Sequence, residues 1–103
     1  MKPYEIYQLD RDNEQAFRMA FMPYEYNLDH GSPITKDLYK KVYAAETACG
    51  KDIHLVLDNL FMIFNTTPPE DFHGHTMSVS DVVVLDGTPY YCDSVGWKQL
   101  TEW

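Results

Sequence analysis

Apolar and polar residues alternate along two stretches of the chain, one near each end. Tyr4–Leu9 alternates and is rich in residues that favour extended structure, which predicts a first strand. Met77–Leu85 alternates at first and ends in a fully apolar run, which is typical of a strand in the middle of a sheet. Both stretches are therefore predicted to belong to one sheet.

A tight turn is predicted directly after the second of these strands. Asp86-Gly87 is the favoured pair for a type I′ turn, because both central positions of that turn need a positive φ. Thr88–Asp93 then returns as the partner strand of a hairpin. Gly96 indicates a bend, and Trp97–Leu100 is predicted to form a last strand or a short turn.

The clearest helical pattern runs from Asp52 to Phe64. Asp52 is an acceptable N-cap, and apolar residues follow it at helical spacing, namely Ile53, Val56, Leu57, Leu60, Phe61 and Phe64. Further apolar residues extend that stripe over most of the circumference, at Leu55, Met62 and Ile63. A helix with this pattern is predicted either to be buried on several sides or to cover a partner.

The stretches between these elements have weaker patterns. Gln15–Met19 is compatible with a short helix, and a strand that begins at Phe17 is an equal alternative; Pro23 ends either one. Tyr24–Pro33 is predicted to be a loop, because it contains asparagine, aspartate, glycine and serine.

The middle of the chain completes the predicted fold. Thr35 or Asp37 can cap a helical turn that contains Leu38 and Tyr39, and Val42–Ala45 is compatible with either a helix or a strand. Together the patterns predict an α+β fold, in which an antiparallel sheet packs on one main helix. We expect the sheet to be a meander that ends in a C-terminal β-hairpin, within one domain over residues 1–103.

The charge of the chain narrows the choice of partner. The chain contains sixteen acidic and eight basic residues, which gives a formal net charge of −8. Direct binding to nucleic acid or an anionic membrane is not expected, because it needs a basic patch. A protein with a basic surface is the favoured partner, since opposite fields raise the rate of encounter. An acidic mimic of DNA stays an alternative if folding gathers Glu5, Asp10, Asp12 and Glu14.

Cysteine usage and apolar runs bear on where the protein works. Cys49 and Cys92 form neither a CxxC pair nor a disulfide framework. The N-terminal residues show no signal-peptide pattern, and no apolar run is long enough to span a membrane. We therefore expect a cytoplasmic protein with two reduced thiols.

Candidate chemistry is sparse in this sequence. His73-Gly74-His75 supplies two possible metal ligands, but no further ligand follows at an accepted spacing. Ser78 and Ser80 are near His75 in sequence, but they share one face of the predicted strand and lie outside any nucleophile motif. No glycine-rich phosphate loop is present. We therefore expect no catalytic residue, no metal and no cofactor.

A long phrase in the second half of the chain resembles one known family. Pro69–Leu85 reads PEDFHGHTMSVSDVVVL, and the YodL-like domain family carries a phrase of the form P-x-D-F-x-G-H-S-L-S-V-S-D-V-V. The tail Tyr91–Trp97, the opening Tyr4–Leu9 and the segment around Tyr39–Glu46 are also similar to the family. Met19–Pro33 matches poorly, which indicates a variable surface there.

The resemblance implies a bacterial protein carried on conjugative elements or phage, in a family suspected of interfering with host proteins. No catalytic residue is established for that family, so none is carried over. Small polar side chains in the phrase are suited to hydrogen bonding with nearby backbone, which predicts a mainly structural role. The family-motif residues with this predicted role are Phe72, Gly74, His75, Ser78, Ser80, Asp81, Asp93 and Gly96.

Our functional hypothesis is a small inhibitor or adaptor that binds a host protein, such as a restriction or CRISPR-type defence component. Interfaces favour aromatic anchors with charged residues at the rim. The partner-binding residues predicted on that ground are Tyr24, Tyr26, Asp29, Trp97 and Trp103. The alternatives are an acidic DNA mimic, a housekeeping adaptor, and a small hydrolase or metal-dependent enzyme.

Overall fold

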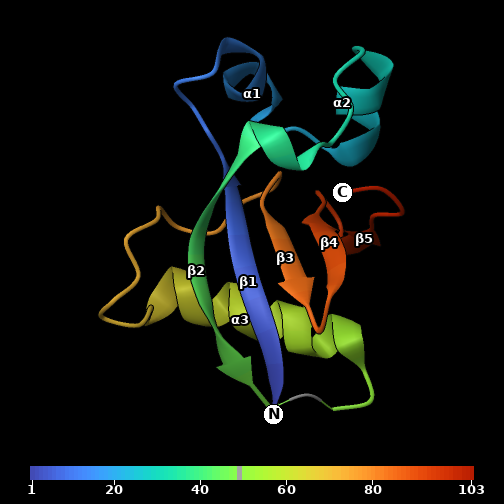
Figure 1. Ribbon diagram of the computed structural model, residues 1–103. Coiled ribbons are helices and arrows are strands. Elements are labelled where there is room, and N and C mark those ends of the chain that lie inside the picture. The colour runs from blue at the N-terminus through green and yellow to red at the C-terminus, as the bar shows by residue number, and fades with distance from the viewer. Residues whose placement is uncertain (49) are drawn as a thin grey trace.

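The computed structural model describes residues 1–48 and 50–103. Five strands within these residues form one antiparallel sheet. The strands lie in the order β2-β1-β3-β4-β5, with β1 at Lys2–Leu9, β2 at Tyr39–Thr47, β3 at Val82–Leu85, β4 at Thr88–Cys92 and β5 at Trp97–Gln99. Helix α3 (Ile53–Thr66) lies across one face of the sheet (Figure 1). The predicted α+β fold is therefore confirmed, with β3, β4 and β5 as the C-terminal meander.

Two short helices gather at one end of the sheet, above the strands in Figure 1. They are α1 (Glu14–Met19) and α2 (Tyr24–Asp29), and the 3-10 helix η1 (Lys36–Leu38) lies with them. The Asn13 side chain caps α1, because its Oδ1 accepts a hydrogen bond from the Ala16 N–H at 3.1 Å. The helical alternative for this segment is thus confirmed. We call residues 14–30, with both helices, the helical cap.

Strand β1 runs between β2 and β3, and both of its faces are covered. Successive side chains of a strand point to opposite faces. Tyr4 and Ile6 accordingly join the core on the α3 side, whereas Tyr7 and Leu9 join a second core on the other side. This double burial explains why the first strand is apolar on both sides of its alternation.

Helix α3 buries only one of its faces. The Asp52 carboxylate caps the helix by accepting a hydrogen bond from the Leu55 N–H at 3.2 Å. The buried residues of the helix are Leu57, Leu60 and Phe64. On the outer face Leu55 is 66% exposed and Met62 is 55% exposed. The alternative of burial on several sides is therefore wrong, because one sheet covers one face and the described chain places nothing over the other, whereas the alternative that α3 covers a partner stays a prediction.

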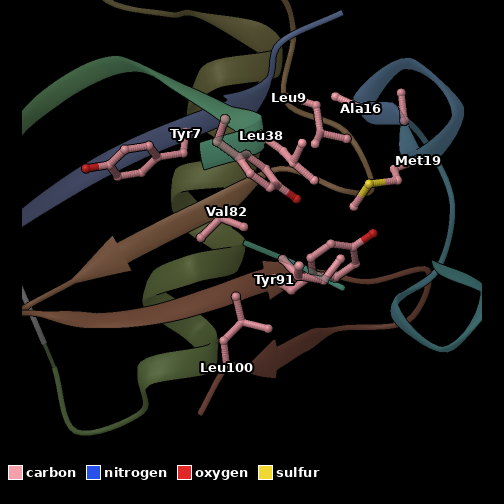
Figure 2. Packing of buried hydrophobic residues seen from close by; sticks show 11 residues of the cluster. Tyr7, Leu9, Ala16, Met19, Leu38, Val82, Tyr91 and Leu100 are labelled. Carbon is pink, nitrogen blue, oxygen red and sulfur yellow. The ribbon is translucent and has the colours of Figure 1, made fainter. Parts of the chain in front are cut away.

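The second core lies between the sheet and the helical cap (Figure 2). Ala16 and Met19 of α1 meet Leu9 of β1 and Tyr91 of β4 in this core. Full burial of a leucine or methionine side chain stabilises a fold by about 1.5–3 kcal/mol. These contacts attach the short helices to the sheet, although neither helix is long enough to be stable alone.

The predicted loop at Tyr24–Pro33 is wrong over its first part, because Tyr24–Asp29 forms α2. Turn-forming composition favoured a loop, but buried contacts decide the local structure here. Asn27 is 1% exposed and faces the protein interior. Gly31, with φ of 74°, follows the helix and begins the remaining loop.

The predicted strand at Met77–Leu85 begins five residues later than expected, at Val82. Ser78 and Asp81 form a turn instead: the Asp81 N–H donates to the Ser78 carbonyl at 3.1 Å, and the Asp81 carboxylate accepts from the Ser78 N–H at 3.0 Å. Ser80 has a φ of 92°, which breaks the extended path. A side-chain hydrogen bond has replaced the expected strand.

The remaining local predictions are resolved as follows. Asp86 and Gly87 have φ values of 50° and 83°, which confirms the predicted turn with positive φ at both positions. Val42–Ala45 lies within β2 and is a strand. Thr35 occupies the N-cap position of η1 without a side-chain hydrogen bond. Among the described residues, no helix is long and apolar enough to cross a membrane. Cys49 lies outside the described residues.

Candidate recognition surface

The family phrase folds around the side-chain amide of Gln8, a buried residue of β1. The Gln8 Oε1 accepts a hydrogen bond from the His75 N–H at 3.2 Å, and the Gln8 Nε2 donates to the His75 carbonyl at 2.8 Å. The same Nε2 donates to Asp81 Oδ2 at 3.0 Å. Gln8 thus pairs with His75 as a neighbouring strand would, and it fixes the loop to the sheet.

Gly74 is required by the close approach of this loop to β1. A Cβ atom at Gly74 would lie 2.6 Å from Gln8 Oε1 and 2.8 Å from the Phe72 ring. The Phe72 ring cannot move away freely, because it packs edge-on against Phe64 of α3 with centroids 4.9 Å apart. Gly74 of the phrase therefore lies in close contact with both the Phe72 ring and the side-chain amide of Gln8.

Asp81 is the buried charge of the phrase, with 1% of its surface exposed. Burial raises its pKa to about 7, although hydrogen bonds from Ser78 and Gln8 and the charge of Arg11 act in the opposite direction. A carboxylate in this position accepts two hydrogen bonds through Oδ2. Asp81 therefore orients the loop and also titrates near neutral pH.

Ser80 connects the phrase to the helical cap. Its Oγ accepts a hydrogen bond from the Phe21 N–H at 3.2 Å, and its carbonyl accepts from the Tyr39 hydroxyl at 2.7 Å. Burial raises the pKa of Tyr39 far above its usual range, so this hydroxyl remains a donor. Phe21 has a φ of 68°, and the Ser80 hydroxyl pairs with its N–H at this unusual position.

Asp93 and Gly96 hold the start of α2. Asp93 Oδ1 accepts hydrogen bonds from the N–H groups of Tyr24 at 3.2 Å and Ser94 at 2.9 Å. The first N–H groups of a helix have no partner within the helix, so a carboxylate stabilises them. Gly96 has a φ of 70°, and its carbonyl accepts the Asp93 N–H at 3.0 Å. Asp93 and Gly96 of the tail thus have a local structural role.

Asn27 joins the two helices of the cap to β4. Its Nδ2 lies 3.3 Å from the Met19 carbonyl and 3.0 Å from the Tyr91 hydroxyl. The Tyr91 hydroxyl in turn donates to the Met22 carbonyl at 2.6 Å. These buried bonds fix α2 relative to α1 and to the sheet.

The exposed side of α2 carries two of the predicted partner-binding residues, Tyr26 and Asp29. Tyr26 is 41% exposed and stacks on His30 with ring centroids 3.9 Å apart. His30 Nδ1 lies 2.8 Å from the Tyr26 carbonyl, which is an acceptor, so this contact fits a tautomer in which Nδ1 donates. An open cleft of about 510 Å³ separates this side from α1, and it is lined by Gln15, Arg18, Tyr26, Asn27, His30, Gly31 and Ser32.

Tyr24 occupies a different environment from Tyr26. It is half-buried, and its ring packs edge-on against Tyr91 with centroids 5.7 Å apart. The Lys98 ammonium lies 5.6 Å from the Tyr24 ring centroid. Tyr24 therefore mainly attaches α2 to the sheet.

Trp97 is a core residue and Trp103 is half-buried against the second core, which does not support either as an exposed anchor. Trp97 is 9% exposed, and its Nε1 donates to Asp58 Oδ1 of α3 at 2.9 Å. Trp103 is half-buried and lies edge-on to Tyr7 and Tyr39, with centroids 5.4 Å and 5.0 Å apart. Both indoles are thus held by contacts with residues far away in sequence.

The N-terminal acidic residues do not form an uncompensated stripe. Three of the four singled out pair with cations: Glu5 with Lys41 at 3.3 Å, Asp10 with Lys40 at 3.4 Å and Glu14 with Arg18 at 3.3 Å. Asp12 is exposed. This distribution does not favour a DNA mimic, which needs carboxylates at phosphate-like spacing along one face.

The residues considered for chemistry are separated in the fold. Within residues 1–48 and 50–103, no group of three or more His, Cys, Asp or Glu residues could hold a metal ion. His73 and His75 border an open groove of about 470 Å³ beside Arg11 and Lys40. Burial raises the pKa of the Cys92 thiol to about 12, so the thiol is protonated at neutral pH.

Four residues that organise the site were absent from the predicted set: Gln8, Asn27, Tyr39 and Tyr91. Gln8 carried a detectable signal, because it is a polar residue on the otherwise apolar side of the first strand. Asn27 gave none, since asparagine is common in loops. The partners of Tyr39 and Tyr91 are 41 and 69 positions away in sequence.

Comparison with known proteins identifies one family. No curated protein and no solved structure matches the chain. A family model described as the YodL-like domain matches residues 3–103, from β1 through the helical cap and α3 to the C-terminal tail. That match includes every residue of the phrase around Gln8 and of the Asp93 turn. The chain therefore belongs to the YodL-like domain family.

Proposed function

We propose that this domain works by binding another protein through the exposed side of α2. The observation that carries the proposal is the contrast within one short helix. Asn27 is held by two buried hydrogen bonds, whereas Tyr26 and Asp29 project to solvent from either side of it in sequence. A rigid aromatic side chain loses little conformational entropy on binding, which suits an anchor.

The partner that fits this surface is a protein with a basic patch. Glu25 and Asp29 both lie on α2, and the chain as a whole carries a net charge of −8. Opposite charges at the rim of an interface increase the association rate. For a protein carried on a bacterial mobile element or phage, we propose a host target such as a defence component, and we assign the domain no catalytic step.

The test is capture of host proteins by the purified domain and by a double variant, Tyr26→Ala with Asp29→Lys. Both side chains are exposed, so the melting temperature should stay within about 2 °C of the parent, as surface substitutions usually do. Capture of the specific partner should fall at least about tenfold, which corresponds to about 1.4 kcal/mol.

A matched control is Leu55→Ala with Met62→Ala, which removes exposed apolar surface from the far face of α3. This control should bind as the parent does. Undiminished capture by the α2 variant, with a normal melting temperature, would refute α2 as the binding surface. If raised salt abolishes capture, and both variants capture the partner as well as the parent does at low salt, the acidic-mimic alternative is favoured.

A further inference from the structure

Strand β2 forms one edge of the sheet and is nine residues long (Figure 1). An edge strand presents a row of backbone donors and acceptors to solvent. Ala44 and Glu46 are exposed in the second half of this strand. Among residues 1–48 and 50–103, the only strand that pairs with β2 is β1.

The backbone groups that face this open edge follow from the antiparallel pattern. The Pro3 carbonyl accepts a hydrogen bond from the Asp86 N–H beyond β3, whereas the Asp10 N–H donates to Leu38 beside β2. The backbone N–H and C=O groups of odd-numbered β1 residues therefore point toward β3, and those of even-numbered residues point toward β2. Tyr4 pairs with Ala45, so the N–H and C=O groups of Ala45 face β1, and those of its neighbours face outward.

The two halves of this edge differ in how strongly they resist strand addition. The first half carries Lys40 and Lys41, and a β-bulge interrupts the register between Tyr43 and Lys41. Charged side chains and bulges are the usual protection of an edge against another chain. The second half presents the small side chain of Ala44 next to Glu46, without a bulge or a lysine.

Acidic residues surround the unprotected half. Asp71 accepts a hydrogen bond from the Tyr43 hydroxyl at 3.0 Å, so the loop after α3 lies against β2 there. Glu70 precedes it and is exposed, as is Glu46 on the strand itself. The nearby Lys41 is already paired with Glu5 at 3.3 Å. A strand placed along this edge would therefore meet unpaired negative charge.

We propose that the Ala44–Glu46 edge of β2 accepts an extended, basic segment of a partner protein as a sixth strand. Backbone hydrogen bonds to Ala44 and Glu46 would supply affinity, and alternate basic side chains would pair with the acidic residues at the edge. This site lies on a different element from the exposed side of α2. It can therefore hold or fail independently of the function proposed for α2.

The test uses a soluble ten-residue peptide of alternating lysine and threonine, with acetylated and amidated ends. Amide hydrogen exchange of the free protein should be fast at Ala44 and Glu46 and slow at Tyr43 and Ala45. Addition of the peptide should protect Ala44 and Glu46. The same peptide with N-methyl groups at alternate residues cannot donate those backbone bonds, so its affinity should be at least about tenfold lower.

Two variants keep the test specific. Ala44→Pro removes an outward N–H without removing a bond to β1, whereas Ala44→Thr keeps that N–H and favours extended structure. Peptide binding should be lost in the first variant and retained in the second. Ala44→Thr also serves as the folded reference should Ala44→Pro lower stability.

Three results would overturn the proposal. Equal binding of the methylated and unmethylated peptides would mean that only surface charge acts. Protection of Ala44 and Glu46 that grows with protein concentration in the absence of peptide would identify a second copy as the occupant. A glutamate–threonine peptide that binds as tightly as the lysine–threonine peptide would show that the edge does not select a basic segment.

Discussion

The two faces of the sheet are held to their helices by a different balance of contacts. Among the described residues, one side-chain hydrogen bond, from Trp97 Nε1 to Asp58 Oδ1, joins α3 to the sheet, whereas several join the helical cap to β4 and the turns beside it. On the α3 face, aromatic rings pack on one another, as Phe64 does with Tyr4, Tyr43 and Phe72. On the other face, the helical cap is attached by apolar packing together with hydrogen bonds in which the Asn27 side chain donates and Ser80 Oγ accepts. Apolar contacts tolerate sliding, whereas a buried hydrogen bond is satisfied in one geometry only. The cap is therefore the more precisely positioned of the two regions.

This difference suits the roles that we propose for the two regions. A recognition surface on a short helix needs a fixed orientation, and the polar contacts of the cap supply it. The α3 layer is held mainly by apolar contact, so its stability should depend on the buried apolar area beneath the helix. Substitutions can test this division, because each layer should respond to a different kind of change.

The largest effect is expected from Phe64→Ala in the α3 layer. Phe64 is 1% exposed, so its loss should leave a cavity and lower the free energy of unfolding by about 3–5 kcal/mol. Urea titration at pH 7 measures the change. As a control, Phe17→Ala at a side chain that is 63% exposed should change stability by about 0.5 kcal/mol or less. Comparable losses in both variants would contradict the assigned packing.

The next effect concerns pH and belongs to Asp81. Its pKa is raised from 3.8 in the unfolded reference to about 7 in the fold, so the folded state retains a proton that the unfolded state has released. The contribution of Asp81 to stability should therefore fall between about pH 4 and pH 7 and stay constant above that range. Over this interval the change is on the order of 4 kcal/mol.

Asp81→Asn isolates this contribution, because an amide can accept the same hydrogen bonds and does not ionise. The difference in unfolding free energy between parent and variant should shift in favour of the variant as pH rises from 4 to 7. Urea titrations at several pH values measure it. Parallel pH profiles for the two proteins would show that Asp81 is ionised throughout this range in the folded state.

A smaller and more local effect is expected from Asn27→Ala in the cap. The substitution removes donors to the Met19 carbonyl and to the Tyr91 hydroxyl, which should cost about 1–3 kcal/mol. Amide exchange in α1 and α2 should accelerate, whereas the amides of α3 should change little. A uniform acceleration across both layers would mean that cap and α3 open together.

The smallest effect is expected at an exposed ion pair on β2. Lys41 and Glu5 lie 3.3 Å apart with side chains that are 52% and 36% exposed. Lys41→Ala should change stability by about 0.5 kcal/mol or less, because water screens such pairs. Thermal unfolding at low and high salt measures this. A large loss at low salt would show that charge contributes more to the sheet edge than its exposure indicates.

Local patterns predicted those parts of the fold that local forces determine. The Asp52 cap, the type I′ turn at Asp86-Gly87 and the first strand each follow from residues next to one another in sequence. The position of β1 between β2 and β3 could not be read locally. It depends on pairing between segments far apart in the chain, and no sequence spacing encodes that choice directly.

The errors in the prediction of the site share one physical cause. α2 and the turn at Ser78–Asp81 are both held by side-chain hydrogen bonds to partners far away in sequence, from Asn27 to Tyr91 and from Gln8 to Asp81, and the turn is also closed locally by the Ser78 N–H and the Asp81 carboxylate. Propensity scales describe average surroundings, so tertiary contacts can override them. The structural role predicted for the phrase rested on short polar side chains, and the bonds of Ser80 and Asp81 agree with it.

The placement of the two indoles has a practical consequence. Trp97 lies in the α3 core, whereas Trp103 packs on the opposite face of the same sheet. Replacement of either one by phenylalanine would leave a single tryptophan in one layer, because the chain contains two tryptophans. Emission from Trp97 would then follow solvent entry beneath α3, and emission from Trp103 would follow it beneath the cap. The protein thus carries a separate optical probe for each of its two layers.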